Sequence, residues 1–435
     1  MKFYGREKEL SELFRIKEIS RTSSRFTVIT GRRRIGKTSL VRKAMEGEDF
    51  IYLFISRVNE SLLCMEAQKI ISDFGIRTVG KITRFRDILE LLMIHSEEQP
   101  LTVMIDEFQD LKYVNESIFR DIQNVWDTYK RTAKMNLIVS GSVYSMMTRL
   151  FESDKEPLFG RPTGRIELRP FPIKLMKKIL SDQNPGYSNR DLLTLFMLTG
   201  GVPMYVEILM DNNASDSRAM IDAATSNGSP FLWEGRNILV SEFGKDHRIF
   251  FSVLQLISSG KITRTEMEDI LGIELGAYLK LLEEEYHIIR HRVPIFSKRN
   301  SRSYRWAISD MYLNFYFRFI QPNISFLESG RYDLIGRTVR ASLPDYEGKV
   351  LDDYFRTKIS EEDIYTEVGS YWNRKGDVEI DLVVLDDISH RARLIEVKRN
   401  PEKIDIGDLR DKGKTLKTEL TGYDVSFEGL SAEDM

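Results

Sequence analysis

The sequence is poor in the residues that build covalent or metal-bridged scaffolds. Its 435 residues include 1 cysteine, Cys64, and 5 scattered histidines, which excludes an internal disulfide framework and leaves no zinc-ligand spacing. No apolar run approaches the ~20 residues of a membrane span, and no apolar signal core follows Met1. We therefore expect a cytoplasmic protein that has no membrane partner.

A large net charge of either sign is also missing. The chain has 64 Lys and Arg residues against 66 Asp and Glu residues, which gives a formal charge of -2. This balance excludes a chain-wide basic coat for nucleic acid, although a local basic patch remains compatible with it. The length favours about three domains.

Short apolar runs alternate with helical patterns through the first third of the chain. Strands are predicted at residues 25–30, 50–55, 101–105, 137–139 and 165–168. Buried strands with helices between them indicate a parallel α/β sheet. After Pro172 the pattern is mainly helical, and it becomes mixed again after Gly330, with a helix expected at 345–358. The predicted fold class is therefore an α/β multidomain protein.

A glycine-rich loop follows the first predicted strand. Residues 31–38, GRRRIGKT, have the spacing GxxxxGK[ST], which arises by chance in about one or two of a hundred chains of this length. Backbone N–H groups of such a loop hold phosphates, Lys37 reaches the β and γ oxygens, and the Thr38 hydroxyl holds Mg²⁺. The predicted ATP-binding residues are Gly31, Arg32, Arg33, Arg34, Ile35, Gly36, Lys37, Thr38 and Ser39. The three arginines of the loop have three possible roles: they contact phosphate, they contact DNA, or they are only solvated.

Two acidic residues end the predicted strand at 101–105. In such a site Asp106 would bind Mg²⁺ through water, and Glu107 would polarise the water that attacks the γ-phosphate. A later strand leads into Ser140-Gly141-Ser142, whose hydroxyls are candidates for contact with that water. Together with Lys37, Glu107 is the predicted catalytic residue of ATP hydrolysis.

These motifs resemble the archaeal ATPase family, which belongs to the AAA+-related P-loop proteins near the signalling ATPases and replication initiators. The resemblance lies in the phosphate loop and in segments 3–10, 106–109, 140–142, 158–161 and 200–203. It implies a P-loop ATPase core at 1–170 and a helical lid at 171–244, with residues 3–10 near the adenine. It also suggests Arg161 as an arginine finger or sensor, in its own subunit or in another subunit of a homo-oligomer. A structural salt bridge or loop anchor is the alternative role of Arg161.

Residues 245–325 have the layout of a winged-helix domain. A capping box at Thr263–Glu266 opens one helix, a second runs from about Leu275 to His287, and two strands follow. The basic residues predicted to form a wing for DNA phosphates are Arg292, Lys298, Arg299, Arg302 and Arg305. Three adjacent acids, Glu283–Glu285, oppose entry of the second helix into a major groove. DNA binding and a contact between domains or subunits both stay open.

Residues 330–435 carry paired polar residues on two predicted strands. Asp381 lies on the first, and Glu396 and Lys398 lie two residues apart on the second, which places the last two on one face of the strand. If the strands form a hairpin, the three side chains converge on one metal ion. Two carboxylates holding Mg²⁺ or Mn²⁺ beside a lysine suit phosphodiester hydrolysis. Glu347, on the helix before the strands, is expected to supply a further ligand.

This arrangement resembles the PD-(D/E)xK nuclease superfamily, with Asp381, Glu396 and Lys398 at its signature positions. The Pro-Asp pair of the signature is absent, because Ile380 precedes Asp381. The resemblance implies a restriction-endonuclease-like α/β domain at 330–435. Two alternatives remain: the charges decorate one polar face of a sheet, or the domain has lost catalysis and only binds DNA or another partner.

Two functions follow from the sequence. The first is an ATPase that couples ATP binding and hydrolysis to DNA binding and metal-dependent DNA cleavage. The second is a signalling or regulatory ATPase whose C-terminal domain serves for interaction alone. DNA-stimulated ATP turnover would favour the first function.

Overall fold

The computed structural model describes residues 1–243, 247–297 and 304–435. The chain divides into two compact units: one is residues 5–169, and the other combines residues 1–4 with residues 170–435. In the part of the chain that is described, no helix is long and apolar enough to cross a membrane.

The unit formed by residues 5–169 contains the five strands that the sequence predicts, each within two residues of its expected bounds. Its strands and helices in chain order are α1 (Glu7–Ser20), β1 (Arg25–Thr30), α2 (Lys37–Ala44), β2 (Ile51–Phe54), α3 (Glu60–Asp73), α4 (Phe85–Glu98), β3 (Leu101–Asp106), α5 (Leu111–Val114), α6 (Ile118–Tyr129), β4 (Met135–Ser140), α7 (Tyr144–Glu152) and β5 (Gly164–Glu167).

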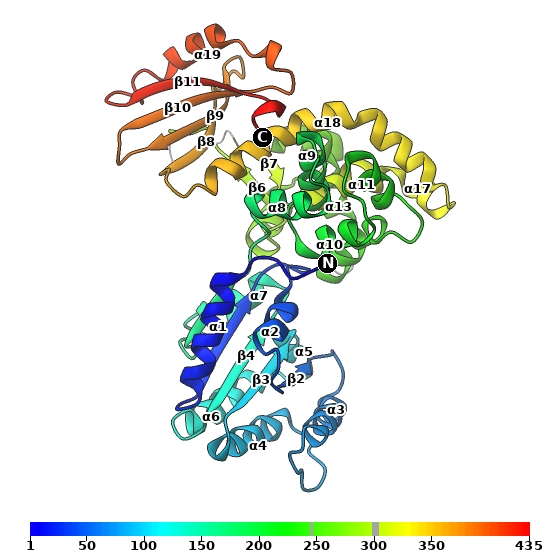
Figure 1. Cartoon of the computed structure of the whole chain (residues 1–435), viewed down its shortest axis with the longest axis vertical. Coiled ribbons are helices and arrows are strands. Elements are labelled where there is room, and N and C mark those ends of the chain that lie inside the picture. Colours follow the sequence, from blue (N-terminus) through cyan, green and yellow to red (C-terminus); the bar gives the residue numbers. More distant parts are fainter. Residues whose placement is uncertain (244–246, 298–303) are drawn as a thin grey trace. The chain divides into compact units, whose positions relative to one another are not determined.

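These strands form one parallel sheet in the order β2-β3-β4-β1-β5. Alternate residues of each strand face opposite sides. On β1, Phe26 and Val28 join a core with α3, α4 and α6, whereas Ile29 joins a core with α1 and α2. Helices therefore cover both faces (Figure 1), and the loops that follow β1, β3 and β4 meet at the carboxyl edge of the sheet.

The unit that contains residues 170–435 is helical at first and mixed afterwards. Its helices and strands in chain order are α8 (Ile173–Gln183), α9 (Asn189–Thr199), α10 (Pro203–Asp211), α11 (Ser217–Ala224), α12 (Glu234–Phe243), α13 (His247–Ser259), α14 (Arg264–Leu271), α15 (Gly276–Lys280), β6 (Ile289–Arg292), β7 (Arg305–Ile308), α16 (Met311–Phe315), α17 (Ile324–Glu328), α18 (Tyr332–Ser360), β8 (Glu367–Trp372), β9 (Glu379–Asp386), β10 (Arg391–Val397), α19 (Ile406–Gly413) and β11 (Asp424–Leu430).

One continuous core joins the regions predicted as lid, winged helix and C-terminal domain. It contains Leu195 of α9, Leu254 of α13 and Leu351 of α18 and extends to Leu382 of β9. The helix expected at 345–358 is longer than predicted, since α18 begins at Tyr332 and runs through Pro344. Figure 1 shows α18 as the long yellow helix of this unit. The division of residues 171–435 into three functional domains stays a prediction.

The second sheet has the strand order β11-β10-β9-β8. The pairs β8–β9 and β9–β10 are antiparallel, and β10–β11 is parallel, with α19 as the connection. On one face, Leu382, Val384, Ile395 and Val397 belong to the core that includes α18. On the other face, Val383, Leu385, Ala392 and Leu394 pack with Leu409 and Leu416 of α19 and the turn after it. The sheet therefore separates α18 from α19.

The predicted helix–turn–helix–ribbon succession is present at 264–308. A capping box at Thr263 opens α14, Gly272 ends it, and α15 continues into a π-helical turn at Leu281–Glu285. The strands β6 and β7 pair antiparallel, with Ile289 opposite Ile308. The segment after β6 also joins the second sheet, because the Ile295 N–H donates to the Ser370 carbonyl oxygen at 2.8 Å. A single backbone bridge therefore connects the segment after β6 to the C-terminal sheet, while β6 and β7 form a separate two-stranded sheet.

Candidate functional site

The phosphate loop lies between β1 and α2, and two of its positions require glycine. Gly31 has φ 141°, and a Cβ there would lie 2.7 Å from the Leu168 carbonyl oxygen. Gly36 is the N-cap of α2 with φ 89° and open space where a side chain would be. An L side chain is strained at such φ values. The glycines thus allow the loop to turn tightly before the N-terminus of α2, where backbone N–H groups point outward.

Lys37 is the first residue of α2, and its side chain folds back over the loop. Its Nζ donates to the carbonyl oxygens of Gly31 at 2.9 Å and Arg32 at 3.1 Å, and the residue is 8% exposed. Burial lowers the pKa of Lys37 to about 8, although the nearby carboxylates of Glu107 and Asp106 oppose this shift. The ammonium group is therefore held on weak neutral acceptors at the place where a phosphate oxygen would bind.

Asp106 ends β3 and accepts hydrogen bonds on both carboxylate oxygens. Its Oδ2 receives the Thr38 hydroxyl at 2.7 Å and the Tyr52 hydroxyl at 3.0 Å. Its Oδ1 receives the Ser140 hydroxyl and the Glu107 N–H. The motif residues Thr38 and Asp106 are thus in direct contact, as a shared Mg²⁺ site requires.

Glu107 is held in a left-handed backbone conformation with φ 52°. Its Oε2 accepts from the Ser142 hydroxyl at 2.7 Å, the Ser142 N–H at 3.2 Å and Gln109 Nε2 at 2.6 Å. The expectation that Ser142 serves the reacting water is refined, because Ser142 contacts the carboxylate itself. Gln109 packs against Gly141, and only glycine fits at position 141, because a Cβ at that position would lie 2.2 Å from Gln109 Oε1.

Two residues of this site were not predicted from the sequence. Tyr52 reaches Asp106 from the neighbouring strand β2, and burial together with the charge of Asp106 raises its pKa to about 12, which keeps it a hydrogen-bond donor. Gln109 follows Glu107 by two residues. The alternation of side chains along β2 could have indicated on which face of the sheet Tyr52 lies. Only the order of the strands shows that its hydroxyl meets Asp106.

The remaining residues predicted for nucleotide binding lie in or beside the loop. Ile35 is buried in the core under α2, and the charge of Arg33 is close enough to Lys37 to disfavour its protonation. From the segment at 3–10, Arg6 Nη2 donates to the Arg169 carbonyl oxygen at 2.7 Å. Arg161 donates to Asp127 at 3.2 Å and to the Phe159 carbonyl oxygen at 2.8 Å. These contacts match the alternative of a loop anchor for Arg161.

The C-terminal candidate site brings together three of the four predicted side chains. Lys398 Nζ lies 3.2 Å from Asp381 Oδ2 and 3.0 Å from Glu396 Oε1. Asp381 also accepts from the Val397 N–H at 2.8 Å. Glu396 is 7% exposed, and its Oε2 has no hydrogen-bond partner among the described residues. Burial lowers the pKa of Lys398, but the two carboxylates outweigh it, so the pKa is raised overall.

Glu347, predicted as a further metal ligand, does not join this site. It lies on α18, on the face of the sheet that carries Val397, whereas Glu396 and Lys398 alternate to the face of α19. Its carboxylate pairs instead with Arg190 at 2.9 Å and Arg399 at 3.2 Å. The described residues contain no group of three or more His, Cys, Asp or Glu side chains able to hold a metal ion.

The predicted basic wing also needs correction. Arg292 pairs with Asp352 and Asp353 of α18, and Arg305 pairs with Glu379 at 2.6 Å and lies 4.3 Å from the ring centre of Trp372. Lys298, Arg299 and Arg302 lie outside the described residues. The two arginines that can be located therefore neutralise acids of the C-terminal domain. Sequence patterns show the charge of a ribbon but not the surface on which it docks.

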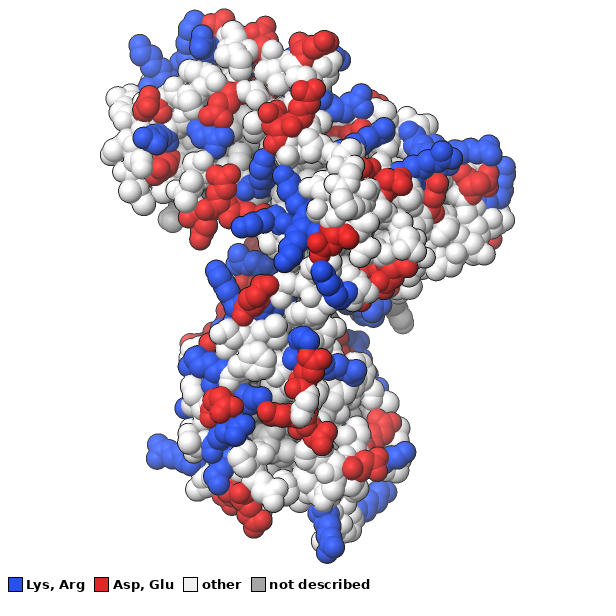
Figure 2. All heavy atoms as spheres, in the orientation of Figure 1, with Lys and Arg blue, Asp and Glu red and all other residues white. Residues whose placement is uncertain are grey.

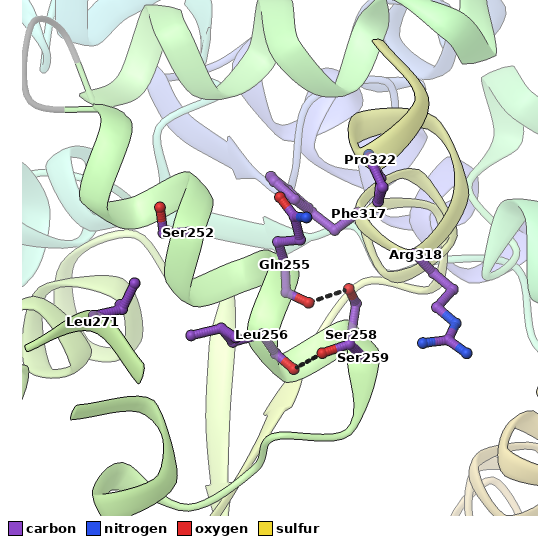
Figure 3. A pocket seen from close by; sticks show the side chains of 9 residues that line it. All are labelled: Ser252, Gln255, Leu256, Ser258, Ser259, Leu271, Phe317, Arg318 and Pro322. Carbon is purple, nitrogen blue, oxygen red and sulfur yellow. Dashed lines mark hydrogen bonds between the residues drawn. The ribbon is translucent and has the colours of Figure 1, made fainter. Parts of the chain in front are cut away.

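One cavity of the unit that contains residues 170–435 lies between α13, the end of α14 and the segment after α16. Its volume is about 470 Å³. Figure 3 shows Phe317 and Leu256 in its wall and the Ser258 and Ser259 hydroxyls bonded to carbonyl oxygens of their own helix. Because these hydroxyl donors are used within α13, the cavity indicates no particular ligand.

Comparison with known proteins agrees with the phosphate site. Residues 3–209 match a family model described as an ATPase domain predominantly from Archaea. Residues 3–209 are thus a nucleotide-binding ATPase domain. Residues 316–407 match a second family model, described as archaeal and bacterial proteins of unknown function.

Two individual proteins resemble the chain over most of its length. An uncharacterised protein of Methanocaldococcus jannaschii is 28% identical over 407 residues, which covers 91% of this chain and 87% of that protein. The solved structure of a Walker-type ATPase of Pyrococcus abyssi is 18% identical and has a TM-score of 0.53, covering 72% of this chain and 96% of that one. At this identity the second likeness shows a shared fold.

Proposed function

We propose that this protein couples the nucleotide state of its ATPase domain to DNA binding and cuts DNA at the Asp381 site with a divalent metal ion. The observation that carries the DNA-processing part is the convergence of Asp381 and Glu396 on Lys398. An acidic pair beside a lysine is the donor set that metal-dependent phosphodiester hydrolysis uses. The resemblance to AAA+-related ATPases and to the PD-(D/E)xK nucleases supports the same assignment.

The ATPase residues each have a defined task. Lys37 leaves the carbonyl oxygens of Gly31 and Arg32 and pairs with the β and γ phosphate oxygens, which are stronger acceptors. Thr38 would hold Mg²⁺ through its hydroxyl and Asp106 would hold it through water, and the ion would neutralise phosphate charge. Glu107 accepts a hydrogen bond from the attacking water. Ser142 and Gln109 fix the direction of that carboxylate.

At the C-terminal site, Lys398 acts as a cation. Its raised pKa keeps it protonated near neutrality, so it binds the scissile phosphate and stabilises the developing charge. Glu396, whose Oε2 lacks a partner among the described residues, and Asp381 would hold Mg²⁺ or Mn²⁺, which would supply a Lewis acid. Both carboxylates fit a hard divalent cation.

A second candidate function is supported by other contacts. Arg292 and Arg305 form ion pairs with acids of the same chain. Glu347 lies away from Asp381 and Glu396. Both observations favour a regulatory ATPase whose C-terminal domain binds a partner without cutting DNA.

One comparison separates the two functions. ATP turnover is measured with and without DNA, and cleavage of duplex, single-stranded, branched and supercoiled DNA is followed in Mg²⁺ and in Mn²⁺. We expect DNA to stimulate turnover and the metal to support nicking that the Asp381→Ala variant loses. DNA-independent turnover with no cleavage in either metal would replace the first function by the second.

A further inference from the structure

Glu347 anchors two arginines that come from distant parts of the chain. Arg190 is the second residue of α9, and Arg399 follows the end of β10. The carboxylate is 3% exposed, and each of its oxygens accepts from a different arginine, Oε1 from Arg190 Nε and Oε2 from Arg399 Nη1. Because one carboxylate binds both, the two guanidinium groups are held next to each other.

The two arginines keep most of their capacity for an anion. Their side chains are 57% and 49% exposed, and each uses one nitrogen for Glu347. Within the described part of the chain, no other hydrogen bond or ion pair of these two groups is present. Two positive charges share one negative charge, so the cluster has an excess positive charge. Arginine binds phosphate through paired N–H groups, and the buried anchor reduces the entropy lost on binding.

A lysine pair extends this positive surface. The start of α8 meets the end of α18, since the Ile173 N–H donates to Glu361 at 2.9 Å. Lys177 of α8 and Lys358 of α18 lie on these two segments, and the pKa of Lys177 is lowered by burial and, to a smaller extent, by the charge of Lys358. The C-terminal turn Ala432–Asp434 links the two pairs, since its carbonyl oxygens accept from Asn189, the neighbour of Arg190, and from Lys358. Figure 2 shows Lys and Arg side chains gathered over the region of α8, with Asp and Glu side chains beside them toward the end of α18.

Acidic groups lie beside the lysine end of this surface, since Glu361, Glu362 and Asp363 follow directly after α18 and are exposed. Asp434 accepts from the N–H and hydroxyl of Ser431, and Glu361 accepts from the Ile173 N–H at the start of α8. The side chain of Glu433 is the remaining acid of the C-terminal turn. The excess positive charge therefore lies at Arg190 and Arg399, where two guanidinium groups face the single carboxylate of Glu347.

We propose that Arg190 and Arg399, positioned by Glu347 and extended by Lys177 and Lys358, bind the phosphodiester backbone of nucleic acid. This inference rests on the DNA binding of the proposed function and gives it a surface that does not depend on the ribbon β6–β7. Guanidinium and ammonium groups recognise phosphates without reading bases, so the binding is independent of sequence. Glu347 then acts as a positioning residue instead of a metal ligand.

The test is a titration of the full chain with a fluorescently labelled duplex and with a single strand of the same sequence, over a range of KCl concentrations. We expect the Arg190→Gln/Arg399→Gln double variant to bind at least about tenfold more weakly and to lose about 1.8 from the duplex salt slope, since each phosphate contact contributes about 0.9. The matched control is Arg218→Gln/Arg337→Gln, because these exposed arginines pair with Asp222 and Asp333 on their own helices. The control should keep the wild-type slope.

A second variant separates positioning from simple charge. Glu347→Gln makes the protein more positive, so an effect of net charge alone would tighten DNA binding. We expect weaker binding, because the two arginines lose their charged anchor. Tighter binding would overturn the positioning role, and thermal unfolding would show that the variant is folded.

The outcomes distinguish this inference from the function on which it rests. If the wild type binds DNA and the double variant matches its control, the surface is overturned and DNA binding stands. If the wild type binds neither nucleic acid, both fail. Binding of a labelled ATP analogue should be unchanged in the double variant, and a loss would reassign the surface to free nucleotides and overturn the proposal.

Discussion

The phosphate site and the Asp381 site were predicted from motifs of similar kind, yet the structure completes them to different degrees. At the phosphate site Thr38, Asp106 and Glu107 come together, and further donors from β2, from the end of β4 and from the loop after it support them. At the Asp381 site two carboxylates and a lysine meet, while Glu347 lies across the sheet with two arginines. The phosphate loop is a contiguous motif, and Asp106 and Glu107 end a strand of the same parallel sheet, so the carboxyl edge of that sheet brings them together. Glu347 instead comes from a helix whose packing against the second sheet no local pattern shows.

The largest expected effect is on ATP hydrolysis. Glu107→Gln keeps the size of the side chain but removes its charge, so the attacking water loses its acceptor. We expect turnover to fall by about 10²- to 10⁴-fold, while nucleotide affinity stays at the wild-type value. Single-turnover hydrolysis and equilibrium binding measure the two quantities. Retained turnover would show that another group positions the water.

The next effect concerns the Asp381 site. Glu396→Gln removes charge from a buried carboxylate that has a free oxygen, and we expect metal-dependent nicking to fall by about 100-fold, since even outer partners of a metal site cost 10- to 100-fold. Glu419→Gln, an exposed glutamate of the same domain, is the control. If both variants cut DNA like the wild type, the carboxylate is not a ligand.

A smaller effect is expected at Tyr52. Tyr52→Phe removes one hydrogen bond to Asp106, worth about 0.5–1.5 kcal/mol, which corresponds to a rise of about 2- to 10-fold in the Mg²⁺ concentration needed for half-maximal ATP turnover. Tyr129→Phe, which loses a bond to Glu90, is the matched control. An unchanged Mg²⁺ requirement would remove Tyr52 from the metal site.

The smallest effect is a proton taken up on binding. With its pKa lowered to about 8, Lys37 is about half charged at pH 8, and phosphate oxygens favour the charged form. Nucleotide binding at pH 8 should take up about half a proton, and affinity should fall as pH rises above 8. Calorimetry in buffers of different ionisation enthalpy measures this uptake. Binding without proton uptake at pH 8 would contradict the lowered pKa.

Much of the fold could be predicted because the responsible signals are local. The apolar run before Gly31 and the capping box at Thr263 each fix an element from adjacent residues. The strand β11 was missed, since Asp424–Leu430 lacks a long apolar run and depends on pairing with β10.

The errors at the candidate sites have a common physical cause. Spacing of two places Glu396 and Lys398 on one face of a strand, but nothing local tells which face α18 covers. Arg292 and Arg305 look like a free basic wing until Asp353 and Glu379 are brought beside them by tertiary packing. The sequence therefore shows which charged side chains a strand carries, but it does not show which residues those side chains contact in the folded protein.

The central claim is that Gly31–Ser39 holds the phosphates of a nucleotide, and direct ATP binding tests it best. Equilibrium titration with ATP and Mg²⁺ compares the wild type, Lys37→Ala and the control Lys43→Ala, which removes an exposed lysine of the same helix paired with Glu46. A lost charge-assisted hydrogen bond costs about 1.5–3 kcal/mol, so Lys37→Ala should bind at least about tenfold more weakly, while Lys43→Ala binds like the wild type. Equal affinity in all three proteins would contradict the account.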